Sequence, residues 1–398
     1  MPPENFARRR FLRSYAVASG LVGMSVAGCT DLMDDRADDG GPGPDRDRPA
    51  YAPYVPAEGL FDDGDDDGTV GGMYVFLDFE TLAEYENLDI EESITTPDEP
   101  VDGSGSGDVA FAAGPTLGLL VYVFGMFGLV GYSFTRDLVP SLGDSSGSDG
   151  DGDFQTRVSL LTSFGYVFLG DYDVESLGET AEGFEAVDER EGVTVFEGQS
   201  ADDGSGFSMA EGLVFAASSE AVLVPLLDTS GDDSGATDAE RNREMVDTMI
   251  DVASGTAERA AESDADVDWM LRTTGHGAFG IGTYGENESL TEEAGDGDGF
   301  GGGSGGNDSE FFDGETRKAI EDIGALLADA KLYGSGIELT DETDAVGHVA
   351  FAYDSSEDVP SDDEFESVFG DVSGEFSLES GETRVYLSAT QSLETSGT

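Results

Sequence analysis

Three aspartates at alternating positions, Asp63, Asp65 and Asp67, are followed directly by a glycine. This is the first half of a calcium-binding loop, in which alternating carboxylates and a glycine turn wrap a hard cation. The twelfth position of the loop would be Tyr74, so the bidentate carboxylate that completes such a site is missing. Because the chain contains 86 acidic residues, this spacing arises readily by composition. A solvated acidic loop is therefore the alternative to a metal site.

The two histidines, His276 and His348, offer little catalytic chemistry. His276 lies in a glycine-flanked loop and His348 at the start of a predicted strand, and neither has a nucleophile or metal ligands at a useful spacing. We interpret them as turn or edge residues. The sequence contains no phosphate loop, dinucleotide fingerprint or HExxH motif. We expect no cofactor, and paired carboxylates for glycoside hydrolysis carry no signal among so many acids.

Cys29 is the only cysteine, so the chain forms no internal disulfide. It follows Val26, Ala27 and Gly28 at the end of an apolar run that begins at Tyr15. A basic segment, a short apolar segment and a small-residue cleavage point are typical of a secretory signal. The run is too short to span a bilayer comfortably, which takes about 20 residues. The alternative is a short N-terminal helix with a buried cysteine.

An arginine pair precedes this apolar run, and twin arginines direct export of folded proteins. The segment 8–29 resembles the twin-arginine signal with a lipobox found on lipoproteins of salt-loving archaea and of bacteria. The resemblance assigns an export motif and a lipobox to these residues: Arg8, Arg9, Phe11 and Leu12, and Val26, Ala27 and Gly28. It implies that residues 1–28 are a signal peptide. Cys29 would be the first mature residue and would carry a lipid that holds the chain to the extracytoplasmic face of the membrane.

The net charge of the chain indicates the environment in which the protein works and the partners that it does not bind. The 398 residues carry a formal net charge of −68, and loss of residues 1–28, with four arginines and one glutamate, leaves −71. Such a charge repels itself unless salt screens it. The acidic, glycine-rich composition, with Lys318 and Lys331 as its two lysines, resembles proteins of halophilic archaea. Nucleic-acid binding is excluded because it requires clustered basic residues. The 24 phenylalanines predict a packed core rather than a disordered acidic chain.

Two composition shifts define the domain organisation. Residues 29–69 are rich in Asp, Gly and Pro and are predicted to be an acidic flexible tether. Within it, the apolar patch 51–56 either packs on the domain as an extended, polyproline-like strap or remains a sticky linker. The folded region begins near Val70.

The folded region repeats one pattern, a strand followed by acids and a helix, at 73–79, 165–169, 278–284 and 347–353. These strands are rich in β-branched and aromatic residues. Predicted helices include 237–261 and 315–331, marked by apolar residues at helical spacing, and 361–369, which opens with a capping box. We predict an α+β fold, mainly antiparallel sheets with packed helices, in two related halves, 70–230 and 231–398. The alternative is an α+β domain whose strand-to-helix turns are unrelated.

The uncharged stretch Val109–Thr135 is long enough to cross a membrane. Its glycines recur at short intervals, and no cluster of positive charge marks a cytoplasmic end. A span here would also return the rest of the chain to the cytoplasm. We therefore favour a buried helix or hairpin, with a segment that dips into the bilayer and a true span as alternatives.

These observations favour a non-enzymatic, lipid-anchored surface protein that binds an unidentified protein or solute, or shapes the cell envelope. The alternative is a solute-binding lipoprotein of a transporter, which would need two parallel α/β lobes about a hinge. A hydrolase is a third reading. The mature region is also similar in composition to exported haloarchaeal lipoproteins without an assigned activity.

The anchor is tested by two substitutions. Cys29→Ser should leave the protein exported but uncleaved or released from the membrane, because the lipid has no thiol to join. Replacing Arg8 and Arg9 by Lys should retain the protein in the cytoplasm. Membrane fractionation and protease accessibility of whole cells measure both effects. Unchanged fractionation of both variants would refute the assignment of residues 1–29.

Stability should depend steeply on ionic strength. Below about 0.1 M salt the screening length reaches ~10 Å, so neighbouring surface carboxylates repel one another. Net folding stability is about 5–15 kcal/mol, which modest repulsion summed over dozens of acids can outweigh. We expect unfolded or molten behaviour in dilute buffer and recovery in molar KCl. A melting temperature that stays flat across a thermal melt series from about 0.05 M to 3 M salt would show that the fold does not rely on screening.

Overall fold

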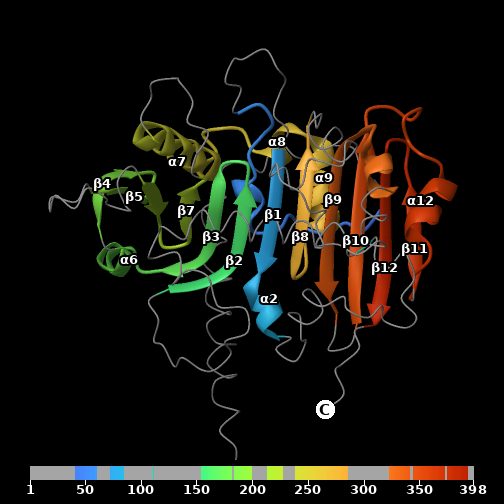
Figure 1. Cartoon of the computed structure of the whole chain (residues 1–398), viewed down its shortest axis with the longest axis horizontal. Helices are drawn as coiled ribbons and strands as arrows, with labels where there is room; N and C mark the ends of the chain where they lie inside the picture. Colours follow the sequence, from blue (N-terminus) through green and yellow to red (C-terminus); the bar gives the residue numbers. More distant parts are fainter. Residues whose placement is uncertain are drawn as a thin grey trace, which may run out of the picture. The chain divides into compact units, whose positions relative to one another are not determined.

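One antiparallel sheet organises the folded region (Figure 1). The computed structural model describes residues 41–60, 72–84, 111, 154–181, 183–199, 213–226, 238–285, 322–340, 344–372 and 374–392. Residues 42–398 form one compact unit. The described strands of the sheet are β1 (Gly72–Asp78), β2 (Phe154–Thr162), β3 (Gly165–Tyr172), β4 (Phe184–Arg190), β5 (Val193–Gly198), β6 (Val214–Ala217), β7 (Ala221–Pro225), β8 (Phe279–Tyr284), β9 (Ala330–Leu339), β10 (Asp344–Tyr353), β11 (Phe376–Ser380) and β12 (Arg384–Ser392).

The strand order is β11-β12-β10-β9-β8-β1-β2-β3-β7-β6-β5-β4. Strands β1 and β8 pair near its centre, with Val75 opposite Ile281 and Phe76 opposite Gly280. The strands of residues 154–225 extend the sheet on the β1 side, and those of residues 330–392 extend it on the β8 side. The prediction of a mainly antiparallel α+β fold is confirmed. The two predicted halves contribute to one sheet.

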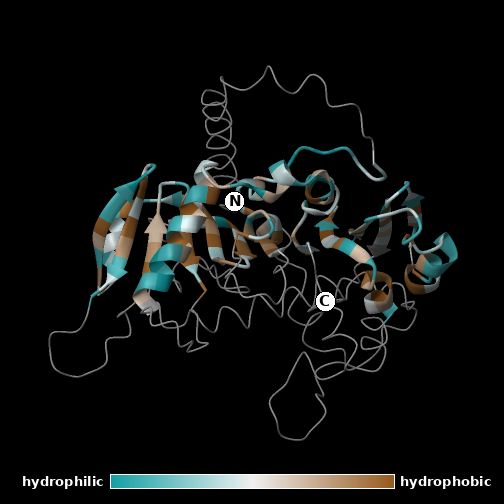
Figure 2. Ribbon diagram, turned by 90° about the horizontal axis from the view of Figure 1, so that it is seen from above, coloured by the Kyte–Doolittle hydropathy of each residue, from teal (hydrophilic) through white to brown (hydrophobic). Residues whose placement is uncertain are grey.

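Helices cover both faces of the sheet. On the first face lie α2 (Phe79–Glu84), α6 (Val174–Thr180) and α12 (Asp362–Phe369); their apolar residues share one core. On the second face lie α7 (Asp238–Ser254), α8 (Ala260–Ser263) and α9 (Ala265–Thr274), with the short 3-10 helix η2 (Ala52–Tyr54). Because both faces are covered, central strands are continuous apolar runs rather than alternating ones. Figure 2 shows hydrophobic stretches along the strands, with hydrophilic residues on the helices and along the outer strands.

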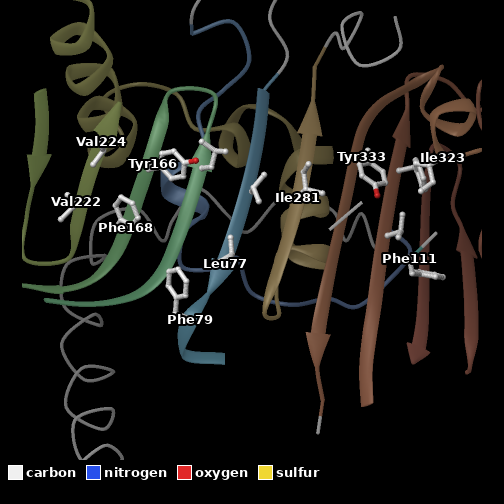
Figure 3. Packing of buried hydrophobic residues seen from close by; sticks show 14 of the residues in the cluster. Leu77, Phe79, Phe111, Tyr166, Phe168, Val222, Val224, Ile281, Ile323 and Tyr333 are labelled. Atoms are coloured by element: carbon white, nitrogen blue, oxygen red, sulfur yellow. The ribbon is translucent and has the colours of Figure 1, made fainter. Parts of the chain in front are cut away.

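The core of the first face runs across both sides of β1 (Figure 3). On β3, Tyr166 and Phe168 point to this face and stack with ring centroids 6.0 Å apart. On the β8 side, Phe351 packs against Phe365 of α12 at 5.4 Å. Alternate residues of a strand face the same way, so Val167, between the two β3 aromatics, joins the core of the second face.

The second face needs small residues where α9 meets the sheet. A Cβ atom added to Gly334 of β9 would lie 2.5 Å from Cγ of Met270, and one at Gly336 would lie 2.4 Å from the carbonyl oxygen of Thr274. Real Cβ contacts are essentially never that close. Glycine at these two positions therefore lets the helix backbone approach the strand.

Several predicted elements end earlier than expected. Helix α6 stops at Thr180, because Phe184 begins strand β4 and packs on Phe215. The helix predicted over 315–331 is described for 322–327, and Ala330 already belongs to β9. The helix predicted over 237–261 is divided at Gly255, whose φ is +76°, into α7 and α8. The capping box at Ser361 is confirmed: the Ser361 amide donates to the Glu364 carboxylate at 2.8 Å.

The uncharged stretch Val109–Thr135 lies outside the described residues except for Phe111. The Phe111 side chain is buried in the first-face core, with its ring 5.1 Å from that of Phe369. Phe111 itself therefore belongs to the core, and the rest of the predicted buried helix or hairpin lies outside the described residues. Among the described helices, none combines the length and apolar character that crossing a membrane requires.

Candidate functional site

The segment 42–60, called the strap here, lies against the second face of the sheet. Tyr51 is 3% exposed, Val55 is fully buried, and the Tyr51 ring stacks on that of Phe76 at 4.8 Å. The predicted strap at 51–56 is therefore present, but Ala52–Tyr54 form a 3-10 turn rather than a polyproline helix. The predicted flexible tether of 29–69 does not describe residues 42–57, because buried aromatic and aliphatic side chains hold them to the domain.

Polar contacts join the strap to α9. The Arg48 guanidinium meets the Asp268 carboxylate at 2.5 Å and also donates to the carbonyl of Ala261 at 3.0 Å. The Trp269 indole N–H donates to the carbonyl of Pro42 at 2.8 Å, and the Tyr51 hydroxyl donates to the carbonyl of Gly275 at 2.9 Å. These contacts connect residues more than two hundred positions apart, so the strap belongs to the tertiary fold.

A buried hydrogen-bonded chain also fastens the strap. His348 is 3% exposed on β10; its Nε2 donates to Glu338 at 3.1 Å, and its Nδ1 shares a hydrogen bond with the Tyr386 hydroxyl at 2.7 Å. The other partner of Glu338 is Arg46 of the strap, at 2.8 Å. The interpretation of His348 as an edge residue is wrong: β10 pairs on both sides, with β9 and β12. His276 does lie in a turn and contacts the carbonyl of Asp47 at 2.8 Å.

The charge of Glu338 is stabilised by these partners. The hydrogen bond from His348 is the largest cause, and together with Arg46 it outweighs burial and lowers the pKa of Glu338 from 4.5 to about 2. Burial raises the pKa of Tyr386 to about 12, so its hydroxyl stays protonated. His348 and Arg46 therefore hold the charged Glu338 carboxylate in place beneath the strap.

The C-terminal end of the strap forms a wall with α8. The amide of Ala57 donates to the carbonyl of Glu258 at 3.2 Å, and the amide of Ala260 donates to the carbonyl of Val55 at 3.0 Å. The Tyr284 hydroxyl, at the end of β8, donates to the carbonyl of Pro56 at 2.6 Å. The end of the strap therefore lies beside the end of β8 and the start of α8.

Beside this wall lies a cavity of about 670 Å³. Its lining combines apolar residues with six carboxylates and one ammonium. The lining residues that matter here are Ala57, Ala260, Val267, Tyr284 and Leu332, with Glu58, Glu258, Asp264, Asp329, Asp354, Asp358 and Lys331. They come from five separate segments of the chain: 57–58 in the strap, 258–267 from the turn before α8 into α9, 284–285 at the end of β8, 328–332 at the start of β9, and 354–358 after β10.

The single ammonium of the cavity is already paired. Lys331 Nζ lies 2.5 Å from Asp266 and 3.2 Å from Asp264. Burial lowers the pKa of Lys331, but the hydrogen bonds and charges of Asp266 and Asp264 outweigh burial and leave the pKa raised. The lysine therefore stays charged and offsets one of the two negative charges of its partners, and the other carboxylates in the lining make the cavity anionic. An anionic cavity whose lining also includes apolar residues suits a cationic organic molecule.

None of the predicted site residues is among the residues that the structure describes. Asp63, Asp65 and Asp67, Cys29 and the export and lipobox residues all fall outside the described part of the chain. Among the residues that are described, no group of three His, Cys, Asp or Glu is arranged to hold a metal ion. Sequence reasoning missed the cavity because five separate segments line it. No local sequence signal indicates that Ala57 and Glu58 meet carboxylates from the other four segments.

Comparison with models of known protein families, with curated proteins and with solved structures found no match. The site therefore rests on its own geometry.

The lowered pKa of Glu338 predicts a pH-dependent contribution to stability. A carboxylate with a lowered pKa stabilises the fold above its ordinary value of 4.5, and this contribution is lost as the pH falls through 4.5 towards 2. Glu338→Gln should therefore melt at a lower temperature than the parent chain at pH 7, and the difference should shrink as the pH is lowered. Thermal melts in constant molar KCl measure this.

The matched control is Glu382→Gln, which removes an exposed carboxylate in the turn before β12. It should change the melting temperature little at any pH. A difference between Glu338→Gln and the parent that is constant over pH would contradict a role for the Glu338 charge.

Proposed function

We propose that this protein is a lipid-anchored, extracytoplasmic, acidic surface protein that binds a cationic ligand in the cavity beside the strap. The single observation that carries the binding function is the cavity of about 670 Å³ with its excess of carboxylates. The proposed localisation rests on the motifs of residues 8–29, which resemble the signal of haloarchaeal twin-arginine-exported lipoproteins.

The anchor accounts for the cysteine usage. Cys29 is the chain's only thiol, and it sits directly after the lipobox residues. A lipid on Cys29 makes the membrane the first partner of the protein. The acidic composition supports an extracytoplasmic setting in strong salt, where the screening length is ~3 Å at 1 M.

The ligand class follows from the cavity lining. Carboxylates at Glu258, Asp354 and Asp358 attract positive charge, and they repel anions and nucleic acids. Ala328 and Ala330 also line the cavity and are not buried, so they offer apolar surface to the methylene groups between charges. An organic polycation presents both features, so we place it ahead of a bare metal ion.

We also propose that the two halves, 70–230 and 231–398, are related. Outward from the β1–β8 pair, each side has a hairpin (β2–β3 or β9–β10), then a first-face helix (α6 or α12), then returning strands. The first half has two additional strands in its return, so β7 lies beside β3 where β12 lies beside β10. If the proposal is correct, the sequences of the two halves should align with one another when they are compared in related chains. Halves whose sequences show no such similarity would overturn the proposal.

The transporter alternative receives no support from the fold. It requires parallel α/β lobes with a hinge, whereas every strand pair among the described residues is antiparallel and lies in one sheet. The hydrolase reading receives no support from His348, because this residue is buried and its two ring nitrogens already bond to Tyr386 and Glu338.

Calorimetry with spermidine as the probe tests the binding function in 1 M and 3 M KCl. We expect saturable binding that weakens as salt increases. Glu258→Gln and Asp354→Asn should each raise the Kd about two- to fivefold, because a partly exposed ion pair contributes up to about 1 kcal/mol.

Glu382→Gln is again the control, because Glu382 lies outside the cavity lining. The proposal fails if spermidine gives no saturable heat, or if the control weakens binding as much as the cavity variants do.

A further inference from the structure

The strap supplies part of the cavity itself. Ala57 and Glu58 line the cavity, and Val55 and Pro56 are the residues that hold this end of the strap to α8 and to Tyr284. Opposite them, Glu258 and Ala260 line the cavity and also bond to the strap through their backbones. The same backbone contacts therefore dock the strap and close the wall of the cavity.

We propose that docking of the strap and binding of a cationic ligand in the cavity are thermodynamically coupled, with Glu58 as a ligand-binding carboxylate supplied by the strap. This inference rests on the proposed cation-binding function.

The coupling has a plain physical origin. When the strap is docked, Ala57 and Glu58 complete the wall and add a negative charge; when it is undocked, the cavity loses both. A ligand that contacts this wall binds the docked state more tightly, and linkage then requires that the ligand stabilises docking by the same factor. The strap follows the segment that contains Cys29, so a bound ligand tightens the connection between the domain and the anchored end of the chain.

The strap can be loosened without touching the cavity. Arg46 and Arg48 pair with Glu338 and Asp268, and none of these four residues lines the cavity. The double variant Arg46→Gln/Arg48→Gln removes both ion pairs. Val55→Ala removes part of a fully buried side chain, which loosens the strap by a second route. Arg157→Gln is the matched control, because its partner Asp171 belongs to the β2–β3 hairpin.

The experiment combines calorimetry and hydrogen exchange on the full-length chain in 1 M KCl, with spermidine as the probe. Saturation of the parent chain with spermidine should slow exchange in peptides covering 42–60 and 255–264 by about threefold or more. Both strap variants should speed exchange there and raise the Kd for spermidine at least about threefold. Glu58→Gln should raise the Kd without faster exchange, and Arg157→Gln should change neither quantity.

The outcomes separate the two proposals. If the parent chain does not bind spermidine, the proposed function fails and this inference fails with it. If the parent binds spermidine but exchange in the strap is unchanged on saturation, the coupling alone is overturned. Wild-type affinity in a variant whose strap exchanges faster overturns it as well.

Discussion

The pairing of β1 with β8 is the contact on which the rest of the structure depends. It joins two strands about two hundred residues apart, and every other described strand is added outward from them. Closing so long a loop costs entropy, which is recovered only when both faces of the joined sheet are buried. Tyr74 and Phe76 face one side of the central strand, and Val75 and Leu77 face the other, so β1 contributes to both cores at once.

The chain's scarce cations are placed where separate segments meet. Arg243 of α7 contacts Asp188 at 2.7 Å on β4 and Glu197 at 3.1 Å on β5. Asp266 of α9 joins Lys331 of β9 and Arg384 of β12. With a net charge of −68, packing any two segments brings carboxylates together. A cation shared between them offsets that repulsion locally, while salt screens the remainder.

The strap connects this architecture to the proposed anchor and to the cavity. Its arginines bind α9 and β9, its aromatic and aliphatic side chains enter the second-face core, and its last residues border the cavity. A segment with a composition typical of a linker is therefore part of the fold. The reason is local: Tyr51 and Val55 bury enough apolar surface to order their neighbours, which the surrounding Asp, Gly and Pro cannot do.

The sequence alone determined the strands with strong apolar character and the helices with clear caps. The predicted strands at 73–79, 165–169 and 278–284 correspond to β1, β3 and β8, and Ser361 caps α12 as expected. These features depend on neighbours within a few residues. The sequence also determined the acidic charge and the motifs of residues 8–29.

Only the tertiary structure decided which strands are neighbours, that Ala330 belongs to a strand, and that His348 is buried between Glu338 and Tyr386. It alone assembled the cavity, whose carboxylates come from segments as distant as Glu58 and Asp358. In a chain with 86 acids, no local pattern distinguishes a cavity carboxylate from a solvated one. The difference lies in long-range packing, because only the folded sheet brings the strap, α8 and the ends of β8 and β9 to one place.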